Sequence, residues 1–438
     1  MFKTLRNALK IEDIRKKLIF TFLMLVVVRF GSQLPIPGAN RDYFQAWFAQ
    51  QTGDAFNFFD AFTGGSFTSM SLFALGITPY ITSSIIVQLL TIAIPKLEEM
   101  QKDGEDGRKK IQTISRYLTV ALALIESIAM TVGFGSRGLL AANTIPNKIV
   151  VIAAMTAGSA FLMWIGEEIT EHGVGNGISI VLLINIVSRI PDDFVTLFDQ
   201  FMKGQTILNA VVAAVVIIAV VLVTVVFVIF LQDGERRIPV QYAKKMQGRK
   251  MVGGQSTNIP LKVNTAGVIP VIFASSLMSF PNVIASLLGK TGGTGIGSKI
   301  MTGLSQSSWC DPSRPIYSLG LVLYIVLVVF FAYFYTSITF NPIEISNNMK
   351  RQGGFIPGIR PGKPTTEYLS RILNYIVFIG AVGLIIVCVI PIFFNGMLGA
   401  NVSFGGTSII IIVGVVLETL KQIESQMLVR YYKGFLND

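Results

Sequence analysis

Ten long apolar runs constrain the fold of this chain more than any other feature. Crossing the roughly 30 Å hydrocarbon core of a bilayer takes about 20 mostly apolar residues of helix. The chain has 438 residues, 52% of them hydrophobic and 14% charged, whereas a soluble domain carries about 25% charged residues. The pattern predicts an all-α integral membrane protein with ten transmembrane helices, at about residues 18–34, 72–94, 112–133, 149–166, 177–190, 207–231, 264–288, 316–340, 370–394 and 407–429.

The basic residues alternate between the two sides of this predicted bundle. A net charge of +11 raises the question of nucleic-acid binding, so the placement of Lys and Arg matters more than their sum. With the N-terminus inside, 27 of the 36 Lys and Arg residues fall on one side, in the N-terminal tail and the segments 95–116, 167–176, 232–263, 341–371 and 421–438. Lys and Arg favour the cytoplasmic side of short loops, so both termini are expected in the cytoplasm.

The first apolar run follows a basic segment at 3–17, as the core of a signal peptide would. It has no small-residue cleavage site, however, and it continues to Gly31 and Pro35. We expect a retained first span.

Two cytoplasmic segments, 232–263 and 341–371, are longer than a tight helix connection needs, and both are basic. The alternating apolar positions at 235–245 predict a short hairpin projecting from the membrane. The run at 353–362 is so rich in Gly and Pro that it excludes a helix and favours a rigid, Arg-tipped loop. The alternative is that both segments only satisfy the positive-inside bias.

The predicted spans differ in polarity. The runs 207–231 and 316–340 are almost wholly apolar and are expected to face lipid, whereas 72–94 and 264–288 carry several hydroxyls, amides, glycines and prolines. Polar groups inside a bilayer are unfavourable unless they face protein or water, so these two spans are expected to border an interior path. Ordinary packing of small residues between helices is the alternative.

A segment before the second span, 56–68, is too short and too broken by Gly to cross a membrane, yet too aromatic for a solvated loop. It is compatible with a re-entrant segment sheltered within the protein. An interfacial helix is the alternative.

No motif predicts catalysis or a cofactor. The Gly-rich run at 292–299 fails the phosphate-loop pattern because its Gly, Ser and Lys stand in the wrong order. His172 stands beside three glutamates without a metal-binding spacing, and Cys310 and Cys388 lie far apart. Glu126 is a carboxylate within a predicted span, which indicates a polar contact or gate.

Seven strings, in order along the chain, resemble the SecY/Sec61 alpha family: PIPG at 35–38, ALGITPYI at 74–81, IGEEITE at 165–171, GNGIS at 175–179, NTAGVIP at 264–270, PGIRPG at 357–362 and GGTS at 405–408. The resemblance implies a protein-conducting channel of ten spans in two inverted five-helix halves around an hourglass pore. The halves here would be 1–190, with spans one to five, and 191–438, with spans six to ten.

The resemblance also implies how such a pore closes. A ring of apolar side chains would seal the waist, formed here by Ile77, Ile81, Leu182, Ile272 and Ile411. The family usually has isoleucine where Leu182 stands, a volume-conserving change. A plug at about 55–69 would cover the outer side, with the core residues Asp60, Ala61, Phe62, Thr63, Gly64, Gly65, Ser66 and Phe67.

A lateral gate between spans two and three on one side and seven and eight on the other would release transmembrane segments into lipid. Thr82, Glu126 and Asn264 match polar positions of that seam, where hydrogen bonds would hold the gate shut. The cytoplasmic loops would contact the SecA motor ATPase or the ribosome through Arg236, Arg237, Lys244, Lys245 and Arg360.

The family works in the bacterial plasma membrane with the small subunits SecE and SecG, and it passes secretory polypeptides selected by a signal sequence. Energy comes from the motor or the ribosome, so the resemblance implies a channel without enzymatic activity or cofactor. The main rival is a secondary transporter, which would need a polar site at mid-membrane where this chain offers only Glu126 and scattered hydroxyls. A membrane-embedded enzyme is the third class, and no paired carboxylates or nucleophile–base sets converge in the spans.

Overall fold

A computed structural model gives the structure of the chain. It describes residues 6, 8–50, 60, 62–135, 138, 140–201, 207–242, 245–247, 250–252, 256–287, 296–305, 308–310, 315–398 and 406–434. Residues 55–59, Ala61 and Lys244, which belong to the predicted plug and contact loop, lie outside this described part.

Ten long helices in the described part correspond one to one, and in order, to the ten predicted spans. They are α2 (Glu12–Gly31), α5 (Thr78–Ala93), α7 (Glu105–Phe134), α8 (Ile145–His172), α9 (Gly177–Phe201), α10 (Ile207–Asp233), α11 (Ile269–Leu287), α13 (Leu319–Thr339), α15 (Lys363–Leu398) and α16 (Gly406–Gly434). Shorter helices are α3 (Arg41–Gln50), α6 (Pro95–Lys102), α12 (Ile296–Leu304) and α14 (Pro342–Arg351).

Several predicted edges are wrong, and the causes are physical. The helix α15 has 36 residues and begins at Lys363 rather than 370, because its first turns pack against the β-strands, in an apolar cluster that includes Leu369, just before the predicted span. The helices α5 and α11 begin later than predicted, at Thr78 and Ile269, because the chain before each of them is folded into turns.

Five of the described helical segments are long and apolar enough to cross a membrane by length and composition: Glu105–Phe134, Ile145–His172, Ala214–Asp233, Pro315–Arg351 and Lys363–Phe393. A sixth is counted if α5 and α6 form one span bent by 108°. Helix α5 alone has only 16 residues, and α2 carries two acidic residues in its first turn and Arg29 in its last. The two spans predicted to face lipid, α10 and α13, expose many large apolar side chains, among them Val223, Phe230 and Phe330.

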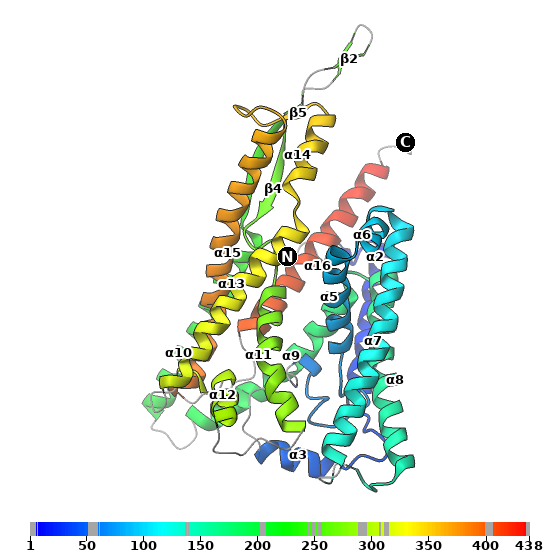
Figure 1. Cartoon of the computed structure of the whole chain (residues 1–438), viewed down its shortest axis with the longest axis vertical. Helices are drawn as coiled ribbons and strands as arrows, with labels where there is room; N and C mark the ends of the chain where they lie inside the picture. The colour runs from blue at the N-terminus through cyan, green and yellow to red at the C-terminus, as the bar shows by residue number, and fades with distance from the viewer. Residues whose placement is uncertain are drawn as a thin grey trace.

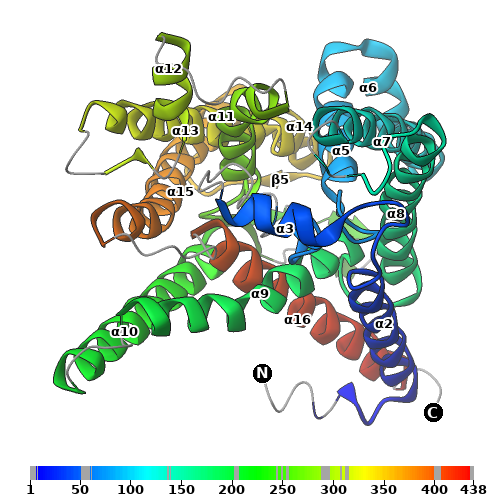
Figure 2. The ribbon, with the colours of Figure 1, turned by 90° about the horizontal axis from the view of Figure 1, so that it is seen from below.

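The helices form two groups. Helices α5, α7 and α8 pack together, and α11, α13 and α15 pack together, while α16 contacts α9, α10 and α15. Figure 2 shows α3 crossing the end of the bundle between these groups. The predicted boundary at residue 190 falls inside α9, which contains Pro191 and continues to Phe201.

A small β-sheet caps the opposite end of the bundle from α3 (Figure 1). Strand β1 (Glu235–Tyr242) pairs antiparallel with β4 (Ser256–Lys262) and with β5 (Gly354–Phe355), with Ile238 opposite Ile259. Strands β2 (Lys245–Gln247) and β3 (Lys250–Val252) pair with each other at the projecting tip. The predicted hairpin is thus confirmed in kind, although it is longer than expected because the partner of β1 is β4.

The second long loop joins the same sheet. Its Gly- and Pro-rich run at 353–362 is not helical, as predicted, but the ten residues before the run form α14. Side chains of β1, β4, α14 and α15 share one apolar cluster that includes Val240, Leu261, Met349 and Leu369. The two basic loops therefore form one folded unit, which we call the sheet unit.

Candidate functional site

The five residues predicted for the pore ring meet in one apolar cluster. Ile77 precedes α5 and is 1% exposed, Leu182 of α9 is 7% exposed and Ile411 of α16 is 3% exposed. Ile81 of α5 and Ile272 of α11 are half-buried against the same cluster. Four helices far apart in sequence thus bring these side chains together.

The local sequence explains why two of these helices begin inside the protein. Gly76 has φ +59° and Gly267 has φ +64°, a backbone conformation that glycine adopts at low cost. Each glycine is followed three residues later by a proline, Pro79 or Pro270, at the second position of the helix. Proline suits the first turn of a helix because the missing N–H there has no helical partner. The same turn thus starts α5 and α11 beside the ring residues.

A cavity of about 440 Å³ lies against the ring cluster. Leu182, Ile272 and Ile411 form part of its wall. The same cavity is lined by polar side chains of α10, β4, α16 and the turn before α11, including Gln232, Lys262, Asn264, Glu418 and Lys421. Water can therefore wet the polar part of the cavity, whereas the part that meets the ring is apolar.

One lining residue of this cavity, Lys421, forms an ion pair. Lys421 Nζ of α16 lies 2.7 Å from Asp233 Oδ1 at the end of α10. Both side chains are about half exposed, so the pair contributes little to stability. Its position shows that the charged residues of the cavity lie at the same end as the β-sheet, because Asp233 leads into β1.

The described part of the predicted plug is buried in the protein. Asp60 is fully buried, and its Oδ2 accepts a hydrogen bond from Arg189 of α9. Its Oδ1 accepts from the backbone N and the Oγ1 of Thr68, both at 2.9 Å. Asn185 Nδ2 of α9 donates to the carbonyl oxygen of Phe62 at 3.2 Å. This burial supports the re-entrant interpretation over an interfacial helix.

The segment touches both the ring and the first span. Phe62 belongs to the same apolar cluster as Ile77 and Leu182. Arg29 of α2 donates to the carbonyl oxygen of Gly64 at 3.4 Å. A side chain at Gly64 would meet the backbone of Asn185 at 2.9 Å, which explains the glycine at this contact.

The three predicted gate residues differ in burial. Thr82 of α5 and Glu126 of α7 are half-buried, and Asn264 is buried in the turn before α11 rather than in a span. Within the described residues these side chains make no hydrogen bond with one another, and Asn264 Nδ2 has no partner at all. The hydrogen bonds expected between them are therefore not present in this conformation, because the late start of α11 leaves Asn264 at the wall of the cavity.

Polar contacts instead join the helices on each side of the expected seam. Ser83 Oγ of α5 donates to the carbonyl oxygen of Ser115 of α7 at 2.7 Å. On the other side, Ser275 of α11 and the hydroxyl of Tyr324 of α13 are 3.5 Å apart. Helix α7 also contacts α11, so the two pairs meet there.

Four of the five predicted contact residues are described, and they lie in the two basic loops. Arg236 and Arg237 are exposed on β1, and Arg360 is exposed in the turn between β5 and α15. In this turn, Thr365 Oγ1 donates a hydrogen bond to the carbonyl oxygen of Arg360 at 2.9 Å. Lys245 lies in β2. The arginines of both loops thus lie on one folded unit.

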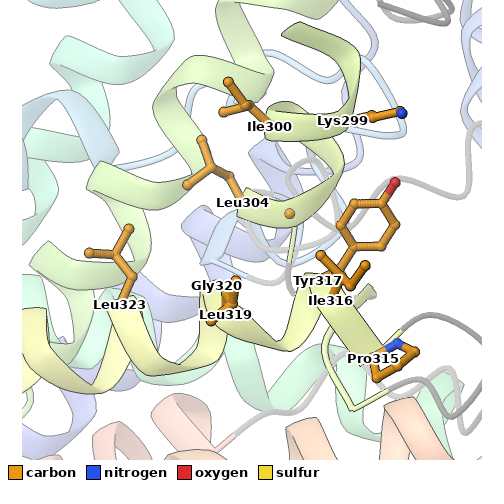
Figure 3. Close-up of a pocket in the computed structure, with 10 residues that line it drawn as sticks. Lys299, Ile300, Leu304, Pro315, Ile316, Tyr317, Leu319, Gly320 and Leu323 are labelled. Carbon is orange, nitrogen blue, oxygen red and sulfur yellow. The ribbon is translucent and has the colours of Figure 1, made fainter. Parts of the chain in front are cut away.

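A second cavity, of about 730 Å³, lies between α12 and the start of α13 (Figure 3). Its wall is mostly apolar, with Ile300, Leu304 and Leu323, and Lys299 and Tyr317 stand at one end. It shares no residue with the first cavity and none with the predicted sites.

The fold and these sites point to one family, and the comparison with family models decides it. The SecY family model matches residues 71–420. The chain belongs to the SecY family.

Relatives of this SecY-family chain are similar along its whole length. It is 44% identical to the protein translocase subunit SecY of Halalkalibacterium halodurans and 41% identical to that of Bacillus subtilis, with 100% of each chain covered. The corresponding subunit of Mycobacterium tuberculosis H37Rv is 42% identical over the same extent.

Solved structures share the fold. One described as "The structure of a protein conducting channel" has a TM-score of 0.62 at 20% identity, covering 94% of this chain and 93% of the other. The Sec61 channel of a canine ribosome-channel complex has a TM-score of 0.58 at 19% identity, covering 94% and 93%. The ten-helix SecY architecture in two halves is thus shown for this chain.

Sequence reasoning missed three residues that contact the predicted plug segment, Arg29, Asn185 and Arg189. The only signal available was the presence of two arginines near the ends of predicted spans that are otherwise apolar. It also missed the repeated Gly-x-x-Pro at 76–79 and 267–270, which a search for similarity between the two halves would have found.

Proposed function

We propose that this SecY-family chain is the pore subunit of a protein-conducting channel in the bacterial plasma membrane. It passes unfolded secretory polypeptides across the membrane and releases transmembrane segments sideways into lipid. The observation that carries the proposal is the convergence of Ile77, Ile81, Leu182, Ile272 and Ile411 on one apolar cluster against a polar-lined cavity.

The chemistry of this ring suits a seal for polypeptides. A narrow apolar constriction resists water and ions by dewetting, and it offers a passing peptide no strong polar site. Aliphatic side chains change rotamer around a bulky cargo. Leu182 fits this role as well as isoleucine does, because the two side chains have the same volume.

The segment Asp60–Phe67 acts as the plug on the far side of the ring. Its support is the burial of Asp60 and the packing of Phe62 in the ring cluster. Opening requires this segment to leave its contacts with α2 and α9, so the plug and the ring open together.

The lateral gate is the contact between α7 and α11, with Thr82, Glu126 and Asn264 as its polar residues. The halves 1–190 and 191–438 separate along it as two units. The hydrogen bonds between Ser83 and Ser115 and between Ser275 and Tyr324 support this, because they join helices within each side and leave the seam itself free to part.

The sheet unit is the cytoplasmic docking site for the SecA motor or the ribosome, through Arg236, Arg237, Lys244, Lys245 and Arg360. Arginine binds both carboxylates and phosphates, so it serves an acidic protein surface and RNA alike. Both termini are cytoplasmic. SecE and SecG complete the complex, the energy comes from the motor or the ribosome, and the chain itself catalyses no reaction.

Import into vesicles tests the function. The purified complex is reconstituted, and a radiolabelled secretory precursor is added with SecA and ATP, beside an isotope-uptake assay for small solutes. The channel proposal predicts precursor protected from external protease and no saturable solute uptake. Solute uptake without precursor import would favour a transporter and contradict the proposal.

A further inference from the structure

The cavity between α12 and the start of α13, which we call the α12 groove, shares no residue with the proposed channel sites. Its volume of about 730 Å³ lies within the range of about 300–1,000 Å³ that is typical of ligand pockets. The wall is formed by α12, the 3-10 helix η3 (Pro315–Ser318) and the first turns of α13. Figure 3 shows Lys299 and Tyr317 at one end of the groove and Leu323 at the other. A ligand along the groove would therefore meet two chemically different ends.

Close packing holds the α12 groove in shape. A side chain at Gly320 of α13 would clash with the carbonyl oxygen of Gly303 of α12, so the two helices touch at these glycines. Trp309 is fully buried, and its Nε1 donates to the same carbonyl oxygen at 2.8 Å. The indole also packs against Tyr324 of α13, with ring centroids 5.5 Å apart. The groove is therefore formed before any ligand binds.

The apolar end of the groove opens onto the exposed face of α13. Leu319 and Leu323 line the groove, and both are exposed. Val322 and Val326 continue the same exposed apolar face, since residues three and four apart share one side of a helix. Helix α13 belongs to a segment apolar enough to cross a membrane, and lipid chains are as apolar as these side chains. An acyl chain can thus enter the groove from the bilayer without crossing water.

The polar end carries one cation. Among the described residues that line the groove, Lys299 is the only charged one, and Tyr317 adds a hydroxyl. Both stand beside the start of α13, at the end of a candidate span, where the headgroups of a bilayer lie. An ammonium at this level attracts an anionic headgroup. A signal sequence fits the groove less well than a phospholipid does, because the segment before its apolar core is positively charged.

We infer that the α12 groove is a binding site for an anionic phospholipid. One acyl chain lies along Ile300, Leu304 and Leu323. The phosphate lies at Lys299 and Tyr317. The lipid comes from the leaflet away from the sheet unit, because α12 and the β-sheet lie at opposite ends of the bundle (Figure 1). The site goes beyond the proposed function, and its occupant stabilises the packing of α12 on α13.

Lipid binding to the purified complex tests the site. The complex is stripped of lipid in detergent and titrated with phosphatidylglycerol that carries a photoreactive acyl chain, or with phosphatidylcholine that carries the same chain. Peptide mapping by mass spectrometry then counts the crosslinks on α12 and on the first turns of α13. A parallel sample contains excess inorganic phosphate, which shows whether the anion alone is recognised. A photoreactive amino acid at Ile300, in native membranes, shows whether lipid or another protein chain occupies the groove.

The variants change one end of the groove at a time. Lys299→Gln removes the charge, Lys299→Arg keeps it, and Leu323→Trp fills the apolar end. Lys148→Gln in the first turn of α8 is the control for charge, and Val326→Trp, three residues beyond Leu323 on the same exposed face, is the control for bulk. Melting temperatures show that each variant is folded, so the test does not depend on protein import.

The site predicts that half-maximal crosslinking needs about fivefold more phosphatidylglycerol in Lys299→Gln, with Lys299→Arg and both controls unchanged. Leu323→Trp is expected to lose the crosslinks. Phosphatidylcholine is expected to bind about fivefold more weakly, and inorganic phosphate is expected to leave the crosslinks intact. The inference is overturned if Lys299→Gln behaves like Lys148→Gln, if phosphate alone displaces the lipid, or if Ile300 captures another protein chain instead of lipid.

Discussion

Arg116 Nε of α7 donates to Glu167 Oε1 of α8 at 2.8 Å, and Glu167 is nearly buried while Arg116 is 41% exposed. Gln112 Nε2 donates to the same oxygen at 3.1 Å. The pair therefore fastens two helices of the first half, and its partners are unequal in their access to water.

This inequality predicts an asymmetric response to mutation. Arg116→Ala leaves the buried Glu167 carboxylate without its cation and costs about 1–3 kcal/mol of stability. Glu167→Gln costs less, because Arg116 reaches water and the amide oxygen still accepts a hydrogen bond. Thermal unfolding of the purified complex measures both. Equal losses of stability from the two variants would contradict the unequal roles of Arg116 and Glu167.

The packing of α8 depends on a glycine, Gly158. A Cβ at Gly158 would lie 1.9 Å from the carbonyl oxygen of Leu72, in the turns before α5. Gly158→Ala is expected to cost about 1–3 kcal/mol, since backbone atoms must move. Gly297→Ala in α12 is the control, because nothing lies within 4 Å of its Cβ, and there the change is expected within about 0.5 kcal/mol. Melting temperatures measure both changes. An unchanged melting temperature for Gly158→Ala would show that α8 packs less closely against Leu72 than in this structure.

Two buried positions on α16 separate sealing from folding. Ile411 belongs to the ring cluster, and Val413 belongs to a different cluster with α10 and α15. Replacing either with Ser lowers stability, by about 2–4 kcal/mol for a buried apolar side chain. Only Ile411→Ser is expected to raise ion leak through the idle channel, because a hydroxyl at the constriction favours wetting. Equal leak from both variants would count against the ring.

Charge reversal in the sheet unit tests its proposed contact with the SecA motor. Arg360→Glu is expected to abolish SecA-driven import while the protein still inserts and its sheet still folds, because the exposed side chain holds no other element in place. Lys109→Glu, at a 68% exposed lysine of α7, is the control and is expected to keep import near normal. Import by Arg360→Glu at the level of Lys109→Glu would show that the basic loop only orients the protein.

An unpartnered amide tests the lateral gate. Asn264 is buried and its Nδ2 has no hydrogen-bond partner. Asn264→Leu is therefore expected to raise the free energy of unfolding by about 1 kcal/mol, and with it the melting temperature. If the amide serves the gate, the same variant releases a transmembrane segment into lipid more slowly. Faster or unchanged release, measured by extraction of the nascent segment into vesicle lipid, would remove Asn264 from the gate.

The helices were predictable from sequence because lipid demands long apolar runs, but their ends were not. The start of α15 lies where side chains such as Leu369 meet a folded sheet, and the starts of α5 and α11 depend on Gly76 and Gly267. Apolarity gives no information about either cause.

The meeting of the five proposed ring residues in one apolar cluster was predictable only through family resemblance, because they come from four helices. The plug contact was not predictable at all, since Asp60 and Arg189 are 129 residues apart in sequence and each alone resembles an ordinary charge near a membrane interface. The position of Asn264 was not predictable for a related reason: it depends on where α11 begins.

Crosslinking tests the central claim most directly. A secretory chain is stalled in the reconstituted complex, with a photoreactive amino acid placed in turn at Ile77, Ile81, Leu182, Ile272 and Ile411, and at the exposed Val223 and Phe230 as controls. Crosslinks to the stalled chain are expected from the five ring positions and none from the two controls. Absence of crosslinks at all five ring positions, in a complex that holds the stalled chain, would contradict it.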